Sequence, residues 1–154
     1  MKIQISPTKK IDDALVVWYE KTPDVDIVID PRQGLNMRES SVKVIYVFNL
    51  LGNSEPDQIF PIVQNLFNIL EPEGEVYIIE TDFDYINRSY LGGDLTLAEL
   101  NQDFRKRTYL NIAEIVKVLD KVGFPEKEQR SWSNMLQFKK EHYEIIISGK
   151  KPKI

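Results

Sequence analysis

The stretch LFNILEPEGEVYIIET, from Leu66 to Thr81, contains the end of an amphipathic helix, a tight turn and a buried strand in that order. Pro72 fixes a backbone angle that suits a turn and removes an amide donor, while Gly74 is able to adopt the positive φ that ends the reversal. The apolar run from Val76 to Ile79 is typical of a strand covered on both faces. The stretch therefore predicts a helix that leads directly into an inner strand of a sheet.

Length and composition indicate one globular domain over residues 1–154, long enough to bury roughly two thirds of the surface of its unfolded chain. Hydrophobic residues make up 42% of the chain and charged residues 29%, as in ordinary globular proteins. The net charge is −4, with acidic and basic residues interspersed, so no nucleic-acid partner is expected.

Chemistry that depends on cysteine or on several histidines is excluded by the residue counts. The sequence has no cysteine, and its one histidine is His142, so neither thiolate nor histidine-based metal sites are expected. Residues 1–10 lack a long apolar core, and no apolar run approaches the roughly 20 residues of a membrane span. We therefore expect a cytoplasmic protein with no membrane partner.

Hydrophobic patterning and capping residues predict the order of the elements. One helix follows Ser54, which forms a capping box with Asp57, and another is capped by Asn111 and ended by Gly123. Apolar residues at helical spacing predict a third helix over 95–107, and residues 81–93 are expected to be irregular with one helical turn. Strands are expected at 2–5, 14–19, 25–30, 42–48 and 75–80, and as an antiparallel pair at 126–132 and 143–148.

Strands that alternate with helices predict an α/β fold with a mainly parallel, Rossmann-like sheet. Three strands precede the first long helix, so the N-terminal helices of such a fold are expected to be trimmed.

With these elements placed, the chain resembles a compact bacterial group of class I S-adenosylmethionine-dependent methyltransferase-like proteins that begin directly on the first strand. The resemblance rests on the proline-glycine turn before the fifth strand and on several further motifs in the same order. These motifs are VDIVID at 25–30, NLLGN at 49–53, ETDFDYINRSYLG at 80–92, VLDKVGF at 118–124 and GKKP at 149–152.

The departures from that family fall on the positions that hold the cofactor. Where the family has a glycine-rich turn after the first strand, this chain has Ile5-Ser6-Pro7-Thr8, and Pro7 removes an amide. The position of the family's ribose-binding acid is occupied by Trp18, and Glu20 could replace that acid only with a two-residue shift. Asp30 keeps the family's adenine-side acid, whereas the family's polar motif after the fourth strand has become Asn49 and Gly52.

Each candidate site residue also has a structural interpretation. Asp30 either contacts adenine or caps the loop before Pro31, and Trp18 either fills the space of the ribose or belongs to the core. Asn49 is either a remnant of a ligand contact or a turn residue that closes a strand.

The segment after the fifth strand leaves two further alternatives. Glu80, Asp82 and Asp84 either bind a hard cation or line a solvated loop. The aromatic group of Phe83, Tyr85 and Tyr90 either packs a lid or interface or has a role in binding.

Because the departures cluster at the carboxyl ends of the strands, the resemblance implies a degenerate methyltransferase fold that does not bind S-adenosylmethionine tightly and acts through protein-protein contacts or self-association. The expected contact surfaces are the remains of the cofactor cleft and the segment 83–107. One alternative is an active methyltransferase for a small molecule or glycan, which holds the cofactor by Asp30 and backbone groups. Another is a structural subunit of a larger assembly.

Overall fold

The computed structural model describes residues 1–94, 96, 98, 108–130 and 144–153. The expected helix over 95–107 lies almost entirely outside these residues, and His142 lies outside them as well. No helix in the described ranges is long and apolar enough to cross a membrane.

One seven-stranded sheet organises the molecule, with strand order β3-β2-β1-β4-β5-β7-β6. Strands β1 to β5 are mutually parallel, and β7 runs antiparallel to both β5 and β6. The predicted α/β class, the mainly parallel sheet and the antiparallel C-terminal pair are therefore confirmed. The strands are β1 (Lys2–Ile5), β2 (Leu15–Trp18), β3 (Ile27–Val28), β4 (Val42–Phe48), β5 (Leu70–Thr81), β6 (Glu126–Arg130) and β7 (Glu144–Lys150).

The connections β1–β2 and β2–β3 contain no helix, which confirms the trimming predicted from the sequence. The β3 strand is also shorter than the expected 25–30, because turns form at both ends of that range, although the Asp26 and Ile29 amides still donate to the Val16 and Trp18 carbonyls, both at 2.9 Å. The Val25 amide donates back to the Thr22 carbonyl, and Asp30 caps the short 3-10 helix η1 (Pro31–Gln33).

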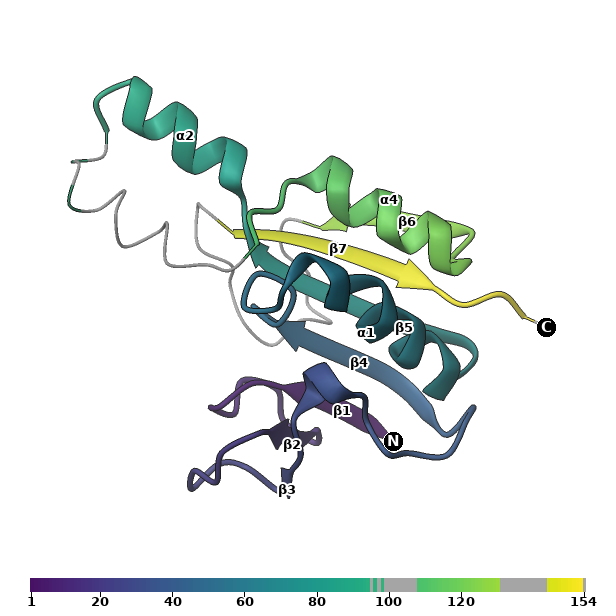
Figure 1. The fold of residues 1–154 in the computed structure, drawn as a ribbon. Helices are drawn as coiled ribbons and strands as arrows, with labels where there is room; N and C mark the ends of the chain where they lie inside the picture. The colour runs from purple at the N-terminus through teal and green to yellow at the C-terminus, as the bar shows by residue number, and fades with distance from the viewer. Residues whose placement is uncertain (95, 97, 99–107, 131–143, 154) are drawn as a thin grey trace.

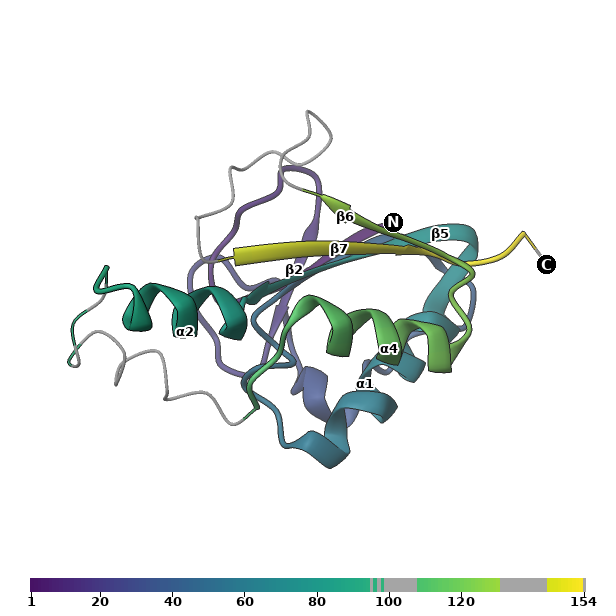
Figure 2. The same ribbon diagram turned by 90° about the horizontal axis from the view of Figure 1, so that it is seen from above.

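Two long helices, α1 (Pro56–Ile69) and α4 (Ile112–Val122), cover one face of the sheet, as Figure 2 shows. Asn111 caps α4 and Gly123 ends it with φ of 119°, as predicted. The start of α1 differs from the prediction, because the side chain of Gln58 accepts from the Glu55 amide at 2.9 Å in place of a box between Ser54 and Asp57. The Ser54 hydroxyl instead donates to the Leu50 carbonyl at 2.7 Å.

The main core lies between the sheet and these two helices. A second, smaller cluster of buried residues lies on the opposite face, where loop residues Ile11 and Ala14 pack beside inner-strand side chains. The main core is built from β1, β4 and β5 with the inner stripes of both helices, and includes Ile3, Ile5, Ile45, Val47, Ile62, Val63, Leu66, Val76, Ile78, Ile115 and Leu119.

The helix–turn–strand stretch forms as predicted, but its turn works differently. Glu73, not Gly74, has the positive φ, at 64°. Gly74 is required for space, because a Cβ there would lie 2.8 Å from the Glu71 carbonyl oxygen and 3.1 Å from that of Lys43. Strand β5 begins already at Leu70, so the turn is an irregularity inside the strand.

The C-terminal basic residues lie against this turn. The Lys151 ammonium donates to the Leu70 carbonyl at 2.8 Å and lies 4.7 Å from the centre of the Phe67 ring. Burial lowers the pKa of Lys151, a shift that the nearby Glu39 opposes. The half-buried Lys151 is therefore part of the packed structure.

Residues 81–93, expected to be mostly irregular, contain a nine-residue helix, α2 (Phe83–Leu91), which projects beyond the sheet in Figures 1 and 2. Asp82 caps it by accepting from the Asp84 amide at 3.1 Å. The sequence pattern hides this cap, because Asp82 lies among other acidic residues in a segment that is expected to be irregular.

Candidate functional site

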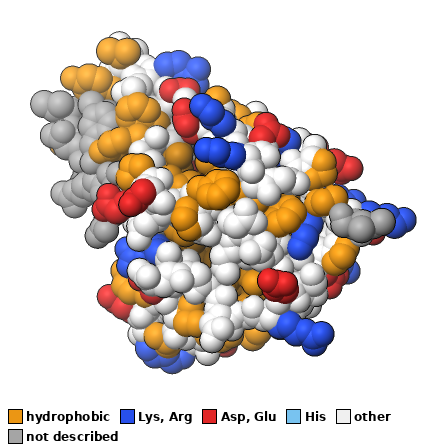
Figure 3. Space-filling model, turned by 45° about the vertical axis from the view of Figure 1, so that its right-hand side comes forward, with side chains coloured by type: hydrophobic (Ala, Val, Ile, Leu, Met, Phe, Trp, Pro, Cys, Tyr) orange, Lys and Arg blue, Asp and Glu red, His pale blue; other side chains and the backbone are white. Residues whose placement is uncertain are grey.

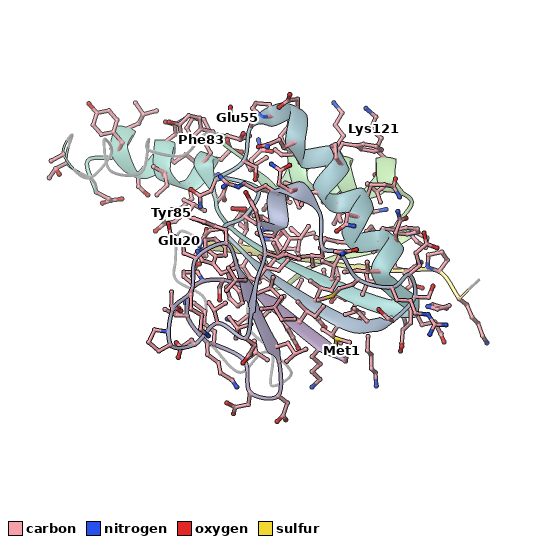
Figure 4. The ribbon with its side chains drawn as sticks, turned by 60° about the horizontal axis from the view of Figure 1, so that its bottom comes forward. Met1, Glu20, Glu55, Phe83, Tyr85 and Lys121 are labelled. Atoms are coloured by element: carbon pink, nitrogen blue, oxygen red, sulfur yellow. The ribbon has the colours of Figure 1, made fainter. Side chains whose placement is uncertain are left out.

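The carboxyl ends of the parallel strands form the candidate site. Strand β1 lies between β2 and β4, so the chain order reverses between β1 and β4, and open α/β sheets bind ligands beside such a reversal. In Figure 4, Glu20 after β2 and Phe83 after β5 lie toward this end of the sheet, while Met1 lies at the amino end of β1.

The turn after β1 is held chiefly by the buried side chain of Gln4. Its amide nitrogen donates to the Thr8 carbonyl at 2.6 Å and to the Ser6 hydroxyl, and its oxygen accepts from the amides of Lys10 and Ile11, both at 2.9 Å. The Ser6 hydroxyl also donates to the Thr8 carbonyl at 2.6 Å. Gln4 is fully buried and Ser6 is 1% exposed, so the turn is closed upon itself.

The backbone donors of this turn are largely engaged within the protein. The Ser6 amide donates to the Val17 carbonyl at 3.3 Å, and the Lys9 amide donates to Oδ2 of Asp24 at 3.0 Å. Pro7 has no amide hydrogen. The amides of Lys10 and Ile11 donate to Gln4, so few backbone groups here point toward a ligand.

The end of β2 presents aromatic rings at the position of the expected ribose acid. Trp18 is half-buried, packs against the main core and lies 5.1 Å from the ring of Tyr19. Glu20 is exposed beyond them. The core interpretation of Trp18 agrees with this packing, although Trp18 also lines a pocket described below.

Asp30 is engaged by its neighbour Arg32. Its Oδ1 accepts from the Arg32 amide and from Nε, both at 3.0 Å, and its Oδ2 accepts from Nη2 at 3.1 Å. These bonds to Arg32 hold the pKa of Asp30 below its usual range, against a smaller opposing effect of burial. Asp30 is therefore the cap of η1, and its carboxylate is occupied in a two-pronged ion pair.

A pocket of about 260 Å³ lies beside this ion pair, lined by Trp18, Tyr19, Pro31, Arg32, Leu50 and Asn53. The Arg32 guanidinium lies 5.2 Å from the centre of the Tyr19 ring, so charge and aromatic surface meet at its wall. The pocket brings the ends of β2 and β4 together with η1, but neither Ser6 nor Asn49 lines it.

Asn49 closes β4 in the left-handed region, with φ of 55°, and its amide donates to the Ile79 carbonyl at 2.9 Å. Its carbonyl accepts from the Asn53 side chain at 2.6 Å, as expected of a turn residue. The side-chain oxygen Oδ1 is buried and has no hydrogen-bond partner, which makes Asn49 the one orphaned buried side chain among the residues described.

The loop after β4 is covered from the β5 side. Glu80 is 1% exposed, and its Oε1 accepts from the Gly52 amide at 2.9 Å. Thr108 lies over the same loop, donating its amide to the Gly52 carbonyl at 3.2 Å and its hydroxyl to the Ser54 carbonyl at 2.6 Å.

The acidic residues after β5 do not converge. Glu80 is buried against Gly52, Asp82 caps α2, and Asp84 is exposed. The described part of the chain contains no group of three or more acidic or histidine side chains that could hold a metal ion. Of the aromatic group, Phe83 lies 5.0 Å from the ring of Tyr109, while Tyr85 and Tyr90 are more than a third exposed.

The sequence interpretation missed the roles of Gln4 and Arg32, and for Glu80 it offered only a cation site or a solvated loop. A polar Gln4 inside an otherwise apolar strand was a signal of a buried hydrogen-bonding role. Arg32 two residues after Asp30 was a signal of a local ion pair. The contact from Glu80 to Gly52 spans 28 residues, and no local pattern indicates it.

Comparisons with known proteins agree on the architecture. No protein-family model matches the sequence, and no curated protein matches it. Solved structures do match over nearly the whole chain. The methyltransferase SibL in its apo form has a TM-score of 0.64 and 13% identity over 98% of this chain, which spans only 50% of SibL.

Two further structures are similar in size to this chain. A methyltransferase from Methanosarcina mazei has a TM-score of 0.67 and 12% identity over 98% of this chain and 92% of its own. A Haloferax volcanii methyltransferase in complex with its activator Trm112 has a TM-score of 0.63 and 13% identity over 98% and 82%. Identities this low support a conclusion about the fold alone. The strand order, the reversal of chain order between β1 and β4, and these likenesses together show that the chain has the fold of class I S-adenosylmethionine-dependent methyltransferases.

Proposed function

We propose that this chain is a non-catalytic member of the methyltransferase fold that works through contacts with other proteins. The observation that carries the proposal is the closed turn after β1. In this fold that turn approaches the methionine end of the cofactor, yet here Gln4 and Asp24 accept from the amides of Lys9, Lys10 and Ile11, and Pro7 supplies none. The residues present therefore do not fit that end of S-adenosylmethionine.

The part of the site that would hold the adenosine end of the cofactor is altered less clearly. The pocket beside Asp30 and Arg32 measures about 260 Å³, just below the ~300 Å³ at which ligand pockets usually begin. It could hold a ring between Tyr19 and Leu50, but Asp30 is already bound to Arg32. This supports weak binding at most and gives no group that would hold a methyl donor in place.

Titration of the purified chain with S-adenosylmethionine by isothermal calorimetry tests the proposal, with S-adenosylhomocysteine in parallel. We expect no heat of binding in the micromolar range for either compound. A matched titration of an active methyltransferase of the same fold shows that the compounds are competent. Micromolar binding to this chain would overturn the proposal.

The pocket favours one second candidate, an active methyltransferase for a small molecule or glycan that holds the cofactor by Asp30 and backbone groups. On that hypothesis, Asp30→Ala abolishes methyl transfer from radiolabelled cofactor to a small-molecule or glycan acceptor. Unchanged transfer in the variant would eliminate it.

A protein partner is consistent with the fold. The Haloferax volcanii methyltransferase was solved in complex with the activator Trm112, so this architecture accommodates a protein on its surface. The face drawn in Figure 3 shows acidic and basic side chains interspersed with apolar ones, with no continuous patch of one sign.

A further inference from the structure

The pocket beside the Asp30–Arg32 ion pair has one charged side chain in its wall, and that side chain is a cation. Of the described residues that line the pocket, Arg32 alone is charged, since neither Asp30 nor Glu20 belongs to the lining. The rest of the wall is aromatic or apolar, apart from one uncharged amide side chain. A wall of this kind favours an anionic ligand over a neutral or cationic one.

Arg32 uses only one of the two hydrogen-bonding edges of its guanidinium group. Its Nε and Nη2 atoms donate to the two carboxylate oxygens of Asp30, at 3.0 and 3.1 Å. Because a guanidinium carries five N–H donors, Nη1 and the second hydrogen of Nη2 form another edge. Among the residues that the structure describes, none bonds to that second edge. Its geometry matches the two oxygens of a carboxylate.

The guanidinium of Arg32 is held in place without a ligand. Asp30 fixes it by two parallel bonds, and its Cζ atom lies 5.2 Å from the centre of the Tyr19 ring. The Arg32 side chain is 24% exposed, so water reaches only part of the charged group. A cation that is already fixed loses little conformational freedom on binding, and partial shielding from water strengthens its attraction for an anion.

The size of the pocket suits one small ring with a short charged substituent. A cavity of about 150 Å³ is enough to hold benzene, and this pocket measures about 260 Å³. The rings of Trp18 and Tyr19 lie 5.1 Å apart in its wall, and Leu50 adds aliphatic surface. Aromatic side chains pack favourably against another flat ring. The wall therefore favours an aromatic ring over a bulkier aliphatic group.

The pocket favours a single negative charge on its ligand. An anion on the second edge of Arg32 lies nearer to the guanidinium than to Asp30, so attraction exceeds repulsion. Glu20 is exposed, and water and salt screen its charge. A doubly charged phosphate would find no second cation in the lining and would be repelled more strongly by Asp30. A carboxylate therefore matches the pocket better than a phosphate does.

We propose that this pocket binds a small aromatic carboxylate, whose carboxylate group pairs with the second edge of Arg32 and whose ring packs against Tyr19 and Leu50. The inference goes beyond the proposed function, because it assigns the chain a ligand that is neither S-adenosylmethionine nor a protein. It requires no group that holds a methyl donor, so it is compatible with a non-catalytic role.

The probe is benzoate, titrated into the isotope-labelled chain and followed by NMR. We expect saturable shifts of the Trp18 indole signal and of the Tyr19 and Leu50 amides. The expected dissociation constant is about 1 mM, a reasonable affinity for so small a ligand. The amides of Glu126–Arg130, in β6 at the far edge of the sheet, should not shift.

Three matched ligands separate the effect of charge from that of shape. Benzamide keeps the ring and lacks the charge, so it should bind at least about tenfold more weakly than benzoate. Cyclohexanecarboxylate keeps the charge and lacks the flat ring, so it should bind about threefold more weakly. Phenyl phosphate carries up to two negative charges at neutral pH and should bind no more tightly than benzoate.

Protein variants test the role of the guanidinium. Arg32→Gln removes the cation and should weaken benzoate binding at least about tenfold, whereas Arg32→Lys keeps the charge without the fork and should cause a smaller loss. Arg38→Gln makes the same change of charge at an exposed arginine outside the lining and should leave binding unchanged. The comparison of benzoate with benzamide uses the unaltered chain, so it decides the question even if Arg32→Gln does not fold.

Equal affinities for benzoate and benzamide, or tighter binding of phenyl phosphate than of benzoate, would overturn the proposal. So would equal losses in Arg32→Gln and Arg38→Gln, or the absence of saturable shifts at Trp18 and Tyr19. Benzoate has neither an adenosine nor a sulfonium group, so its binding and the calorimetric result for S-adenosylmethionine are independent of each other. A failure of this inference is therefore distinguishable from a failure of the proposed function.

Discussion

Gln4 is fully buried and satisfies polar backbone groups of the turn after β1, whose residues 7–10 are themselves exposed. Its side chain bonds to the Thr8 carbonyl and to the amides of Lys10 and Ile11. A similar-sized apolar side chain would leave those backbone groups without partners, and each orphaned buried group costs about 1 to 3 kcal/mol. Such a residue can fix the conformation of a loop that has no regular secondary structure.

We expect Gln4→Leu to lower the free energy of unfolding by about 2 to 4 kcal/mol, measured by urea titration. Gln33→Leu, at an exposed position of η1, serves as the control and should change it by less than about 0.5 kcal/mol. Equal stability of Gln4→Leu and the wild type would mean that the turn is not held by this side chain.

The ion pair of Asp30 and Arg32 predicts a pH dependence of stability. Because bonding to Arg32 lowers the folded-state pKa of Asp30 below its ordinary value of 3.8, the folded state binds fewer protons than the unfolded state in that interval. The stabilisation is therefore complete above the ordinary pKa and is lost as the pH falls through the folded-state pKa.

Asp30→Asn removes this contribution. We expect the variant to be less stable than the wild type at neutral pH, with the two unfolding free energies converging as urea titrations are taken down to about pH 3. A difference that stays constant over that range would contradict the assignment.

The turn near the start of β5 shows that a chain reversal depends on space as well as on backbone angle. Gly74 lies where any Cβ would meet the backbone oxygens of Glu71 and Lys43, while the positive φ is adopted by Glu73. The bond from Lys151 to Leu70 and the bond from the Lys151 amide to the Gly74 carbonyl, at 2.8 Å, fix the turn from the C-terminal side.

Two neighbouring substitutions are expected to act in opposite directions. Gly74→Ala should lower the free energy of unfolding by about 1 to 3 kcal/mol, because the clash is with backbone that has to shift. Glu73→Gly should be neutral or stabilising by up to about 1 kcal/mol, since it relieves the left-handed conformation of a non-glycine residue. Thermal and urea unfolding of both variants measure these effects, and unchanged stability of Gly74→Ala would show that the backbone oxygens of Glu71 and Lys43 do not exclude a Cβ at this position.

At the scale of the whole molecule, one sheet with one main core joins the N-terminal and C-terminal parts of the chain. Strands β1 and β4 pair directly, and β7 pairs with β5, so residues 2 and 150 belong to the same sheet. Such an arrangement predicts a single cooperative unit over residues 1–154.

Unfolding in urea followed by tryptophan fluorescence and by far-ultraviolet circular dichroism should therefore give coincident transitions. The fluorescence signal includes Trp18 at the end of β2, and the circular dichroism signal averages over all helices and strands. Transitions that differ in midpoint would show that the N-terminal strands unfold separately.

Local patterns in the sequence were sufficient for most of the fold. The bounds of β1 and β4, the cap and end of α4, and the helix–turn–strand order at Leu66–Thr81 depend on residues close in the chain, where propensity and periodicity act. The absence of glycine from the turn after β1 was also visible in the sequence alone.

Only the tertiary structure decided the contacts between residues far apart in the chain. The bond from Gly52 to Glu80 and the closeness of Gly74 to Lys43 depend on which strands are neighbours. The sequence by itself determined a mainly parallel, methyltransferase-like sheet and a turn after β1 that contains no glycine. The structure decided how that turn is closed and which residues line the pocket beside Arg32, because strand neighbours and burial arise only when distant segments pack together.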